Sequence, residues 1–242
     1  MLHAAPRLIV PRCPREGERL RLAASEVAHA RAKRMAPGDA VVLLDGSGVE
    51  AHGRFVRFSR GGAEIEVESV VPASPAGDRI LLAAAGIRPE RLAWMAEKAT
   101  ELGAARFLLL VSERTQAHRA APALSARLER VIREAAKQSE SVRWPSVEGP
   151  CTLEELFSRE TRGARFLLDS SGAPFPGEIR EREVSLAIGP EGGWTEAELR
   201  SAGSAGWSVR SLPAGKLRAE TAAVAALALA RAALEARRQG VV

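Results

Sequence analysis

The sequence predicts an α/β protein in which a small β domain precedes a larger domain built on a parallel sheet. Three observations predict this class. Short apolar runs separated by turn residues fill roughly the first 70 positions, and a stretch rich in proline and small residues follows at 71–78. Beyond it, apolar runs alternate with amphipathic stretches, which is the strand–helix–strand order of a parallel sheet. We therefore expect domains at 1–72 and 73–242.

Short strands and one helix make up the expected front domain. The strands are predicted where apolar residues cluster between turn residues, at 8–10, 20–22, 41–44, 49–58 and 65–71. A helix is predicted from a capping Ser25 to Met35. Gly46, Gly48 and Ala51 fit a dinucleotide-binding pattern, but a strand-like run follows them where that pattern needs a helix. We interpret them as a hairpin turn.

The rest of the chain alternates strands with helices. Strands are predicted at 80–85, 107–111, 166–168, 184–188 and 207–212, which makes a sheet of five. Pro89 suits a first helical turn, and capping boxes begin at Thr152 and Thr195. Apolar residues at helical spacing predict another helix around 124–135, and an alanine-rich helix extends from about 217 to 237.

Two of these strands end in tight loops that lead directly into helices. The first loop is Gly-Pro-Glu-Gly-Gly at 189–193, and the second spans 213–216. Ligands of open parallel sheets bind outside the carboxyl ends of the strands, and glycines let backbone N–H groups approach a ligand closely. The first loop alone is more often a plain turn than a site. Two such loops on successive strands instead predict a ligand site.

Composition limits the classes of function. The net charge is +5 and the pI is near 10.0, which permits attraction to nucleic-acid phosphates. Because 30 acidic residues offset the 35 basic ones, any such footprint must be a local patch. Cys13 and Cys151 stand far apart, so we expect neither a disulfide framework nor a metal site. We expect no signal peptide and no membrane span, and hence a cytoplasmic protein.

Each loop is part of a longer motif, and the two motifs follow one another along the chain. The first is Ile-Gly-Pro-Glu-Gly-Gly at 188–193, and the second is spread over Ser211, Leu212, Leu217, Arg218, Glu220, Thr221 and Ala222. They resemble the signatures of the SPOUT RNA methyltransferases and, within these, of the RsmE family. Two shorter stretches, at 98–103 and 134–139, resemble the same family, and the likeness spans about residues 20–222. Three positions depart from the family pattern: Pro213, Lys216 and Ser141.

The resemblance implies a fold, a cofactor and a reaction. The fold is a SPOUT-type parallel sheet with a trefoil knot, a PUA-like RNA-binding β-barrel in front of it, and assembly as a homodimer. The reaction is the methylation of N3 of a uridine in 16S ribosomal RNA of the small subunit, with S-adenosylmethionine as cofactor and no metal. The residues implied to hold the cofactor lie at strand ends and on both loops: Leu168, Ile188, Gly189, Glu191, Gly192, Gly193, Ser211, Leu212, Pro213 and Leu217.

Arg218 and Glu220 are the candidate catalytic pair. The N3 atom of uracil carries a proton, so a carboxylate can accept it while a cation stabilises the developing anion. An ion pair between the two side chains that caps the last helix is an equally supported alternative.

The candidate RNA contacts lie in the front domain. Arg31, Lys33 and Arg34 form either a solvated helix face or part of an RNA footprint. Two other functions stay open at this stage. One is a SPOUT enzyme that acts on transfer RNA, and the other is a non-catalytic ribosomal-RNA-binding assembly protein. The latter would tolerate degraded cofactor loops, whereas both loops are intact here apart from the substitutions named above.

Overall fold

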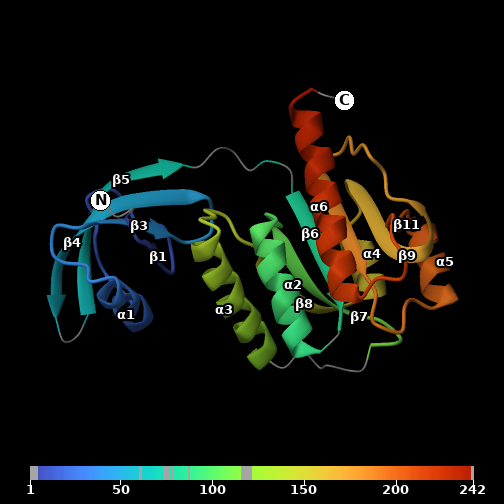
Figure 1. Ribbon diagram of the computed structural model, residues 1–242, viewed down its shortest axis with the longest axis horizontal. Coiled ribbons are helices and arrows are strands. Elements are labelled where there is room, and N and C mark those ends of the chain that lie inside the picture. The colour runs from blue at the N-terminus through green and yellow to red at the C-terminus, as the bar shows by residue number, and fades with distance from the viewer. Residues whose placement is uncertain are drawn as a thin grey trace. The chain divides into compact units, whose positions relative to one another are not determined.

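The computed structural model describes residues 5–59, 62–72, 77, 79–86, 88–115 and 122–240 (Figure 1). The chain divides into two compact units, one made of residues 1–76 with 136–143, the other of residues 77–135 with 144–242. The predicted linker at 71–78 lies largely outside the described residues. The segment 136–143, although distant in sequence, clusters with the first unit.

The first unit is a five-stranded sheet with one helix. Its elements are β1 (Arg7–Ile9), β2 (Arg19–Arg21), α1 (Ala24–Ala32), β3 (Ala40–Leu44), β4 (Val49–Ser59) and β5 (Gly62–Pro72). The strand order is β1-β3-β4-β5-β2, in which β1 is parallel to β3 and the other pairs are antiparallel. The strands occur where the apolar runs predicted them. Gly46 and Gly48, both with positive φ, turn the chain between β3 and β4, so the hairpin interpretation is confirmed.

The predicted cap of α1 was wrong. The N-cap position is Ala23, and no side chain caps the helix. Glu26 in the first turn is buried instead, and its carboxylate accepts hydrogen bonds from the backbone N–H of Ile9 at 3.1 Å and from the Lys137 ammonium at 2.8 Å. Burial of Glu26 against β1 therefore fixes where the helix begins, and Ser25 stays exposed.

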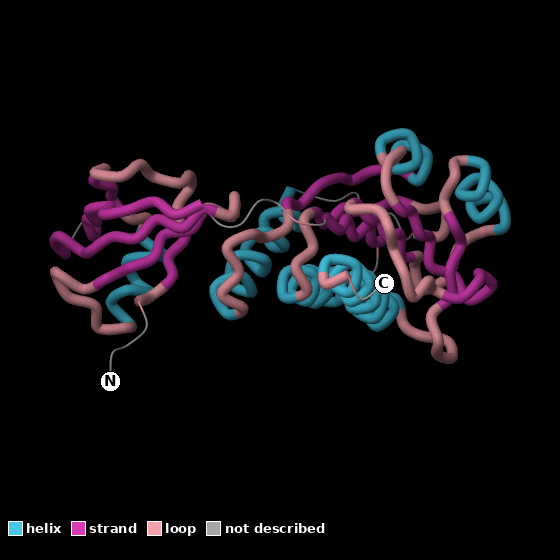
Figure 2. The backbone as a smooth tube through the Cα atoms, turned by 90° about the horizontal axis from the view of Figure 1, so that it is seen from above, coloured by secondary structure: helices cyan, strands magenta, loops and turns pink. Residues whose placement is uncertain are grey.

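The second unit is a six-stranded parallel sheet between two layers of helices (Figure 2). Its elements are β6 (Arg79–Ala85), α2 (Pro89–Glu101), β7 (Arg106–Val111), α3 (Pro122–Gln138, whose last turn belongs to the first unit), β8 (Ser146–Thr152), α4 (Leu153–Arg159), β9 (Ala164–Pro174), β10 (Glu183–Ile188), α5 (Glu196–Ser204), β11 (Ser208–Ser211) and α6 (Ala219–Arg238). The strand order is β11-β9-β10-β6-β7-β8. Both predicted capping boxes, at Thr152 and at Thr195, are confirmed.

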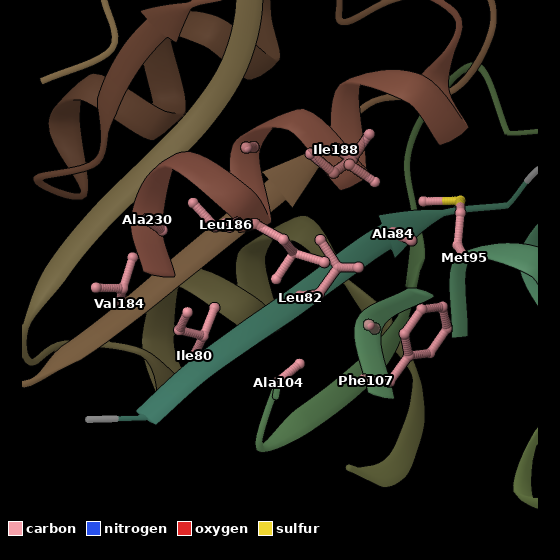
Figure 3. Packing of buried hydrophobic residues seen from close by; sticks show 14 of the residues in the cluster. Ile80, Leu82, Ala84, Met95, Ala104, Phe107, Val184, Leu186, Ile188 and Ala230 are labelled. Atoms are coloured by element: carbon pink, nitrogen blue, oxygen red, sulfur yellow. The ribbon is translucent and has the colours of Figure 1, made fainter. Parts of the chain in front are cut away.

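Alternate residues of the central strands enter two separate cores. Ile80 and Leu82 of β6 lie with Leu186 of β10 in the core beneath α2, α3 and α6 (Figure 3). Leu81 and Ala83 point the other way, into the core beneath α4 and α5. A strand covered on both faces needs apolar side chains at every position, which explains the continuous apolar runs in the sequence.

The expected sheet of five strands was wrong, because β8 is a sixth strand at the edge beyond β7. Its sequence, Ser-Val-Glu-Gly-Pro-Cys-Thr, contains a glycine, a proline and no apolar run. The pairing with β7 shifts register beside Gly149 and Pro150. Proline lacks the N–H that a central strand needs, so an edge position is where such a strand is tolerated. The apolar-run criterion therefore missed it.

Charged side chains join the starts of β7 and β8. The Arg106 guanidinium donates two hydrogen bonds to Glu148, at 2.7 and 2.8 Å, and a third to Glu160 at 2.6 Å. The hydrogen bonds from Arg106 hold the pKa of the Glu148 carboxyl below its ordinary value. A carboxyl with a lowered pKa in the folded state stabilises the protein above its unfolded-state pKa and loses that contribution as the pH falls.

We expect the Glu148→Gln variant to lose less thermal stability on acidification than the wild type. The pair is partly exposed, so the pH-dependent contribution is about 1 kcal/mol, or roughly 2–4 °C in melting temperature. Melting curves between about pH 6 and pH 3 span the ordinary titration range of glutamate and check this. Glu196→Gln, at a side chain that is 90% exposed, is the control and should follow the wild type. Parallel curves for Glu148→Gln and wild type would contradict the prediction.

Candidate cofactor site

A cavity of about 840 Å³ lies in the second unit, at the ends of β10 and β11 and beside the middle of β9. Most of the residues expected to hold the cofactor line it: Leu168, Ile188, Gly189, Glu191, Gly192, Gly193, Ser211, Leu212 and Leu217. Pro213 is exposed and does not line it. Arg218 and Ala219 line the cavity, whereas Glu220, the next residue, does not. The structure thus brings both loops, although they are separated in sequence, around one space.

The glycine-rich loop is built around a buried tryptophan. The indole N–H of Trp194 donates to the carbonyl of Leu168 at 3.0 Å, which ties the loop after β10 to the middle of β9. A Cβ at Gly189 would lie only 3.0 Å from the indole ring, so any larger residue there would push the ring away from its present position. Gly193 has φ +69° and its N–H donates to the carbonyl of Pro190 at 2.9 Å. This positive φ favours glycine because it has no Cβ to clash.

A third loop supports the first from outside. The Arg114 guanidinium, which follows β7, donates to the carbonyl of Gly192 at 2.8 Å. The backbone N–H of Glu113 donates to the buried carboxylate of Glu198 at 2.9 Å, and the Thr195 hydroxyl donates to Glu113 at 3.2 Å. Glu198 therefore serves its own capping box and fixes the neighbouring loop as well. Sequence reasoning found the box but missed Arg114, because its partner is a backbone carbonyl 78 positions away.

Arg91 is the other side chain that sequence reasoning missed. It lies in the first turn of α2 and lines the cavity. Its Nη1 donates to the carboxylate of Glu191 at 2.5 Å, and its Nε lies 3.6 Å from that of Glu220. A signal was present, since a cation in the first turn opposes the positive end of the helix dipole and so requires another reason.

The candidate catalytic residues occupy the start of α6. Arg218 is the N-cap residue, but its side chain makes no capping hydrogen bond. Glu220 is only 14% exposed at its side chain, and one of its oxygens, Oε2, is buried without a hydrogen-bond partner. Among the described residues the carboxylate pairs with Arg91 and not with Arg218. The alternative of a helix-capping Arg218–Glu220 ion pair is therefore not supported.

The candidate RNA contacts are in the first unit and take no part in the cavity. Arg31, Lys33 and Arg34 are all exposed at the end of α1. Arg31 donates to the carbonyl of Ser59 at 2.7 Å. Arg34 has φ +56°, and the N–H groups of Arg34 and Met35 close the helix onto carbonyls of its last turn. The part of the chain that the structure describes contains no cluster of three metal-ligating side chains, and none of its helices could span a membrane.

Comparisons with known proteins place this geometry in a family. A family model described as an RNA methyltransferase domain matches residues 74–231. The ribosomal RNA small subunit methyltransferase E (RsmE) of Synechocystis sp. is 32% identical over 214 residues, which cover 85% of this chain and 70% of the relative. The chain belongs to the RsmE family. The RsmE of Mycobacterium bovis is 31% identical over 215 residues, covering 82% of this chain and 80% of its own.

Solved structures of similar proteins carry the cofactor. The RsmE of Neisseria gonorrhoeae, bound to S-adenosylmethionine, has a TM-score of 0.82 and 26% identity, and the alignment covers 93% of this chain and 96% of that one. A methyltransferase of Legionella pneumophila with bound S-adenosylmethionine has a TM-score of 0.85 and 25% identity, with 96% and 98% covered. The α/β fold of this RsmE-family chain is thus shared with cofactor-binding relatives.

The cavity fits S-adenosylmethionine in size and chemistry. Its volume lies within the range of about 300–1,000 Å³ that small-molecule sites occupy. Apolar side chains suited to an adenine ring line it: Leu168, Ile188, Leu212 and Leu217. Charges of both signs, at Glu191, Lys216 and Arg218, match a ligand that carries both a carboxylate and an ammonium group. The Nε of Arg210, which also lines the cavity, is a buried donor without a partner.

Proposed function

We propose that this RsmE-family chain transfers a methyl group from S-adenosylmethionine to N3 of a uridine in the 16S ribosomal RNA of the small subunit. One observation carries the proposal. The two family loops, separated in sequence, together line one cavity at the carboxyl ends of β10 and β11, the two parallel strands on either side of β9. The names of the relatives specify the small-subunit ribosomal RNA, and the Neisseria relative holds the cofactor.

The roles of Arg218 and Glu220 follow from the chemistry of the acceptor. When bound, S-adenosylmethionine supplies an electrophilic methyl group. Uracil N3 must lose its proton before or during attack, and we assign that proton to the Glu220 carboxylate. Arg218, which lines the cavity, stabilises the negative charge that then develops on the uracil ring. The loops hold the reactants in place, and positioning supplies much of the rate gain.

A direct assay tests this function. Purified protein is incubated with labelled S-adenosylmethionine and with three substrates: small ribosomal subunits, free 16S ribosomal RNA and transfer RNA. Nucleoside mass spectrometry of the products should show N3-methyluridine in ribosomal RNA only. Methylated transfer RNA would favour the other SPOUT activity, and cofactor binding without any methylated RNA would favour the non-catalytic alternative. Modification mapping of ribosomal RNA from a deletion strain gives the position in the cell.

Arg31, Lys33 and Arg34 form the proposed RNA contact of the first unit. Replacing all three by glutamine should weaken binding of 16S ribosomal RNA and reduce the slope of log affinity against log salt by roughly 2 to 3, since each phosphate contact contributes a little under 1. Binding titrations between low and moderate salt measure the slope.

Controls for this RNA prediction come from the other unit. Arg133 and Arg200 are exposed and each pairs with a glutamate one helical turn away. Replacing them by glutamine removes charge without touching the proposed contact, so the salt slope should stay that of the wild type. Cofactor affinity should also be unchanged in the triple variant. An unaltered slope in the triple variant would mean that the three residues form a solvated helix face and not an RNA contact.

The finer features of the fold belong to the same proposal. The five-stranded sheet and helix of the first unit support a PUA-like RNA-binding barrel. A trefoil knot is supported by the path of the chain, which leaves β11 at one edge of the sheet and continues as α6 against β10 and β6. A ribosomal RNA substrate supports a cytoplasmic enzyme.

An apolar surface supports the proposed homodimer. Trp94 of α2 is 41% exposed and Leu229 of α6 is 37% exposed, and the two helices pack against each other. Ala228 and Ala232 extend the exposed apolar face of α6. A second copy of the chain is the occupant that the family resemblance implies. Analytical ultracentrifugation should show a dimer, and Leu229→Asp should shift it toward monomer. A monomeric wild type would overturn the assignment.

A further inference from the structure

We propose that Arg91 is a positioning residue of the methyl transfer, which holds the Glu220 carboxylate in place for its acceptor and ties it to the glycine-rich loop. The inference rests on the proposed function, because Glu220 is the proton acceptor of that reaction. No sequence motif singles out Arg91. The geometry around the cavity does.

The Arg91 guanidinium contacts a carboxylate at each of the two cofactor loops. Arg91 reaches Glu191, in the middle of the first loop, through Nη1 at 2.5 Å, and Glu220, just after the second loop, through Nε at 3.6 Å. The five N–H donors of arginine point outward in a fixed plane, so one side chain can contact two carboxylates at once. Among the described residues, Arg91 is the only cation within 4.0 Å of either carboxylate.

Exposure decides which of the two contacts matters more. The Glu191 side chain is 57% exposed, so water and salt screen its pair with Arg91 despite the short distance. The Glu220 side chain is 14% exposed and Arg91 is 27% exposed, so their attraction is screened much less. Glu220 also has a buried oxygen, Oε2, without a partner, so Arg91 supplies its one described interaction of opposite charge. We therefore assign the larger effect of Arg91 to turnover and the smaller one to cofactor affinity.

The position of Arg91 is unfavourable for a cation within its own helix. A cation three residues into α2 opposes the partial positive charge of the helix start and is therefore unfavourable there. Arg88, at the N-cap position of the same helix, is exposed and does not line the cavity. Of the two arginines at this helix start, Arg91 lines the cavity and Arg88 does not. Arg88 is the matched control.

The test combines Arg91 variants with changes at each carboxylate. Arg91→Met should lower kcat at saturating cofactor and RNA by about 10-fold or more, while the cofactor Kd rises by less than about 5-fold, the scale of an exposed ion pair. In the Glu220→Gln background, Arg91→Met should cause little further loss of kcat, because the group it positions is already gone. In the Glu191→Gln background it should still lower kcat. Arg91→Lys should restore part of the kcat, and Arg88→Met should match the wild type.

Separate outcomes identify what has failed. Full kcat in a folded Arg91→Met enzyme would overturn the role of Arg91 and leave the proposed function intact. The same conclusion would follow if the double variant lost kcat by the product of the factors measured for Arg91→Met and Glu220→Gln alone. A wild type that binds the cofactor but methylates no RNA would overturn the proposed function and the role of Arg91 together. If Arg91→Met does not fold, Arg91→Lys is tested in its place. An Arg91→Lys enzyme with the kcat and cofactor Kd of the wild type would contradict positioning by a guanidinium that contacts two carboxylates.

Discussion

Replacing Glu220 by glutamine is expected to lower the turnover number by about 100-fold or more, the usual scale of general-base catalysis. The amide keeps the size of the side chain but does not accept a proton as the carboxylate does. Raising the pH should recover part of the loss, because uracil then supplies its own anion. Rates of methylation of 16S ribosomal RNA at saturating cofactor, measured across a pH series, check both statements.

Melting temperature separates this role from a structural one. If Glu220 only balances the charge of Arg91, the glutamine variant should melt at a lower temperature and its residual rate should not respond to pH. Glu235→Gln, an exposed position further along the same helix, is the control and should keep full activity. A stable Glu220→Gln enzyme with full activity would contradict both roles.

Substitutions at Gly193 are expected to weaken S-adenosylmethionine binding in a graded series. The residue has φ +69°, which costs an L-amino acid roughly 1–2 kcal/mol and a β-branched one more. Asparagine tolerates this conformation best, so the loss of affinity should increase from Gly193→Asn to Gly193→Ala to Gly193→Val. For valine we expect at least about 10-fold, since 1.4 kcal/mol corresponds to that factor. Calorimetric titration with the cofactor measures the series.

The surroundings of Gly193 make the cause identifiable. A Cβ there would meet no atom within 4 Å beyond the two chain neighbours, so in Gly193→Ala the loss comes from the backbone conformation and not from crowding against the protein. Gly203→Ala in α5 is the control, because a Cβ there also meets nothing and no positive φ is involved. An equal effect of all three substitutions at Gly193 would point to obstruction of the cavity and away from the backbone conformation.

Local patterns in the sequence predicted most of the fold. Buried strands such as β6 and β10 are built mostly of apolar residues, and the capping boxes at Thr152 and Thr195 depend on contacts three residues apart. The edge strand β8 and the far half of β9 were missed because pairing with a neighbour, and not apolar content, holds them in the sheet.

The residues of the site also fall into those that the sequence predicted and those that it missed. Its two loops were predictable because each is a continuous stretch with a recognisable order of residues. Arg91 and Arg114 were missed because they reach the loops from elements 78 to 129 positions away in the chain. Such contacts exist only after the sheet has brought the strand ends together. A charge at an unfavourable helix position, as at Arg91, was the single local sign of them.

The tryptophan in the wall of the cavity gives the protein a built-in optical reporter. The chain has four tryptophans and no tyrosine, so its near-ultraviolet emission comes from indole alone. Trp194 is buried, hydrogen-bonded to the carbonyl of Leu168, and in contact with the space that the cofactor is proposed to fill. Indole emission responds to the polarity and packing of its surroundings. Occupancy of the site can therefore be followed by the fluorescence of the unlabelled protein, in real time and without altering either partner.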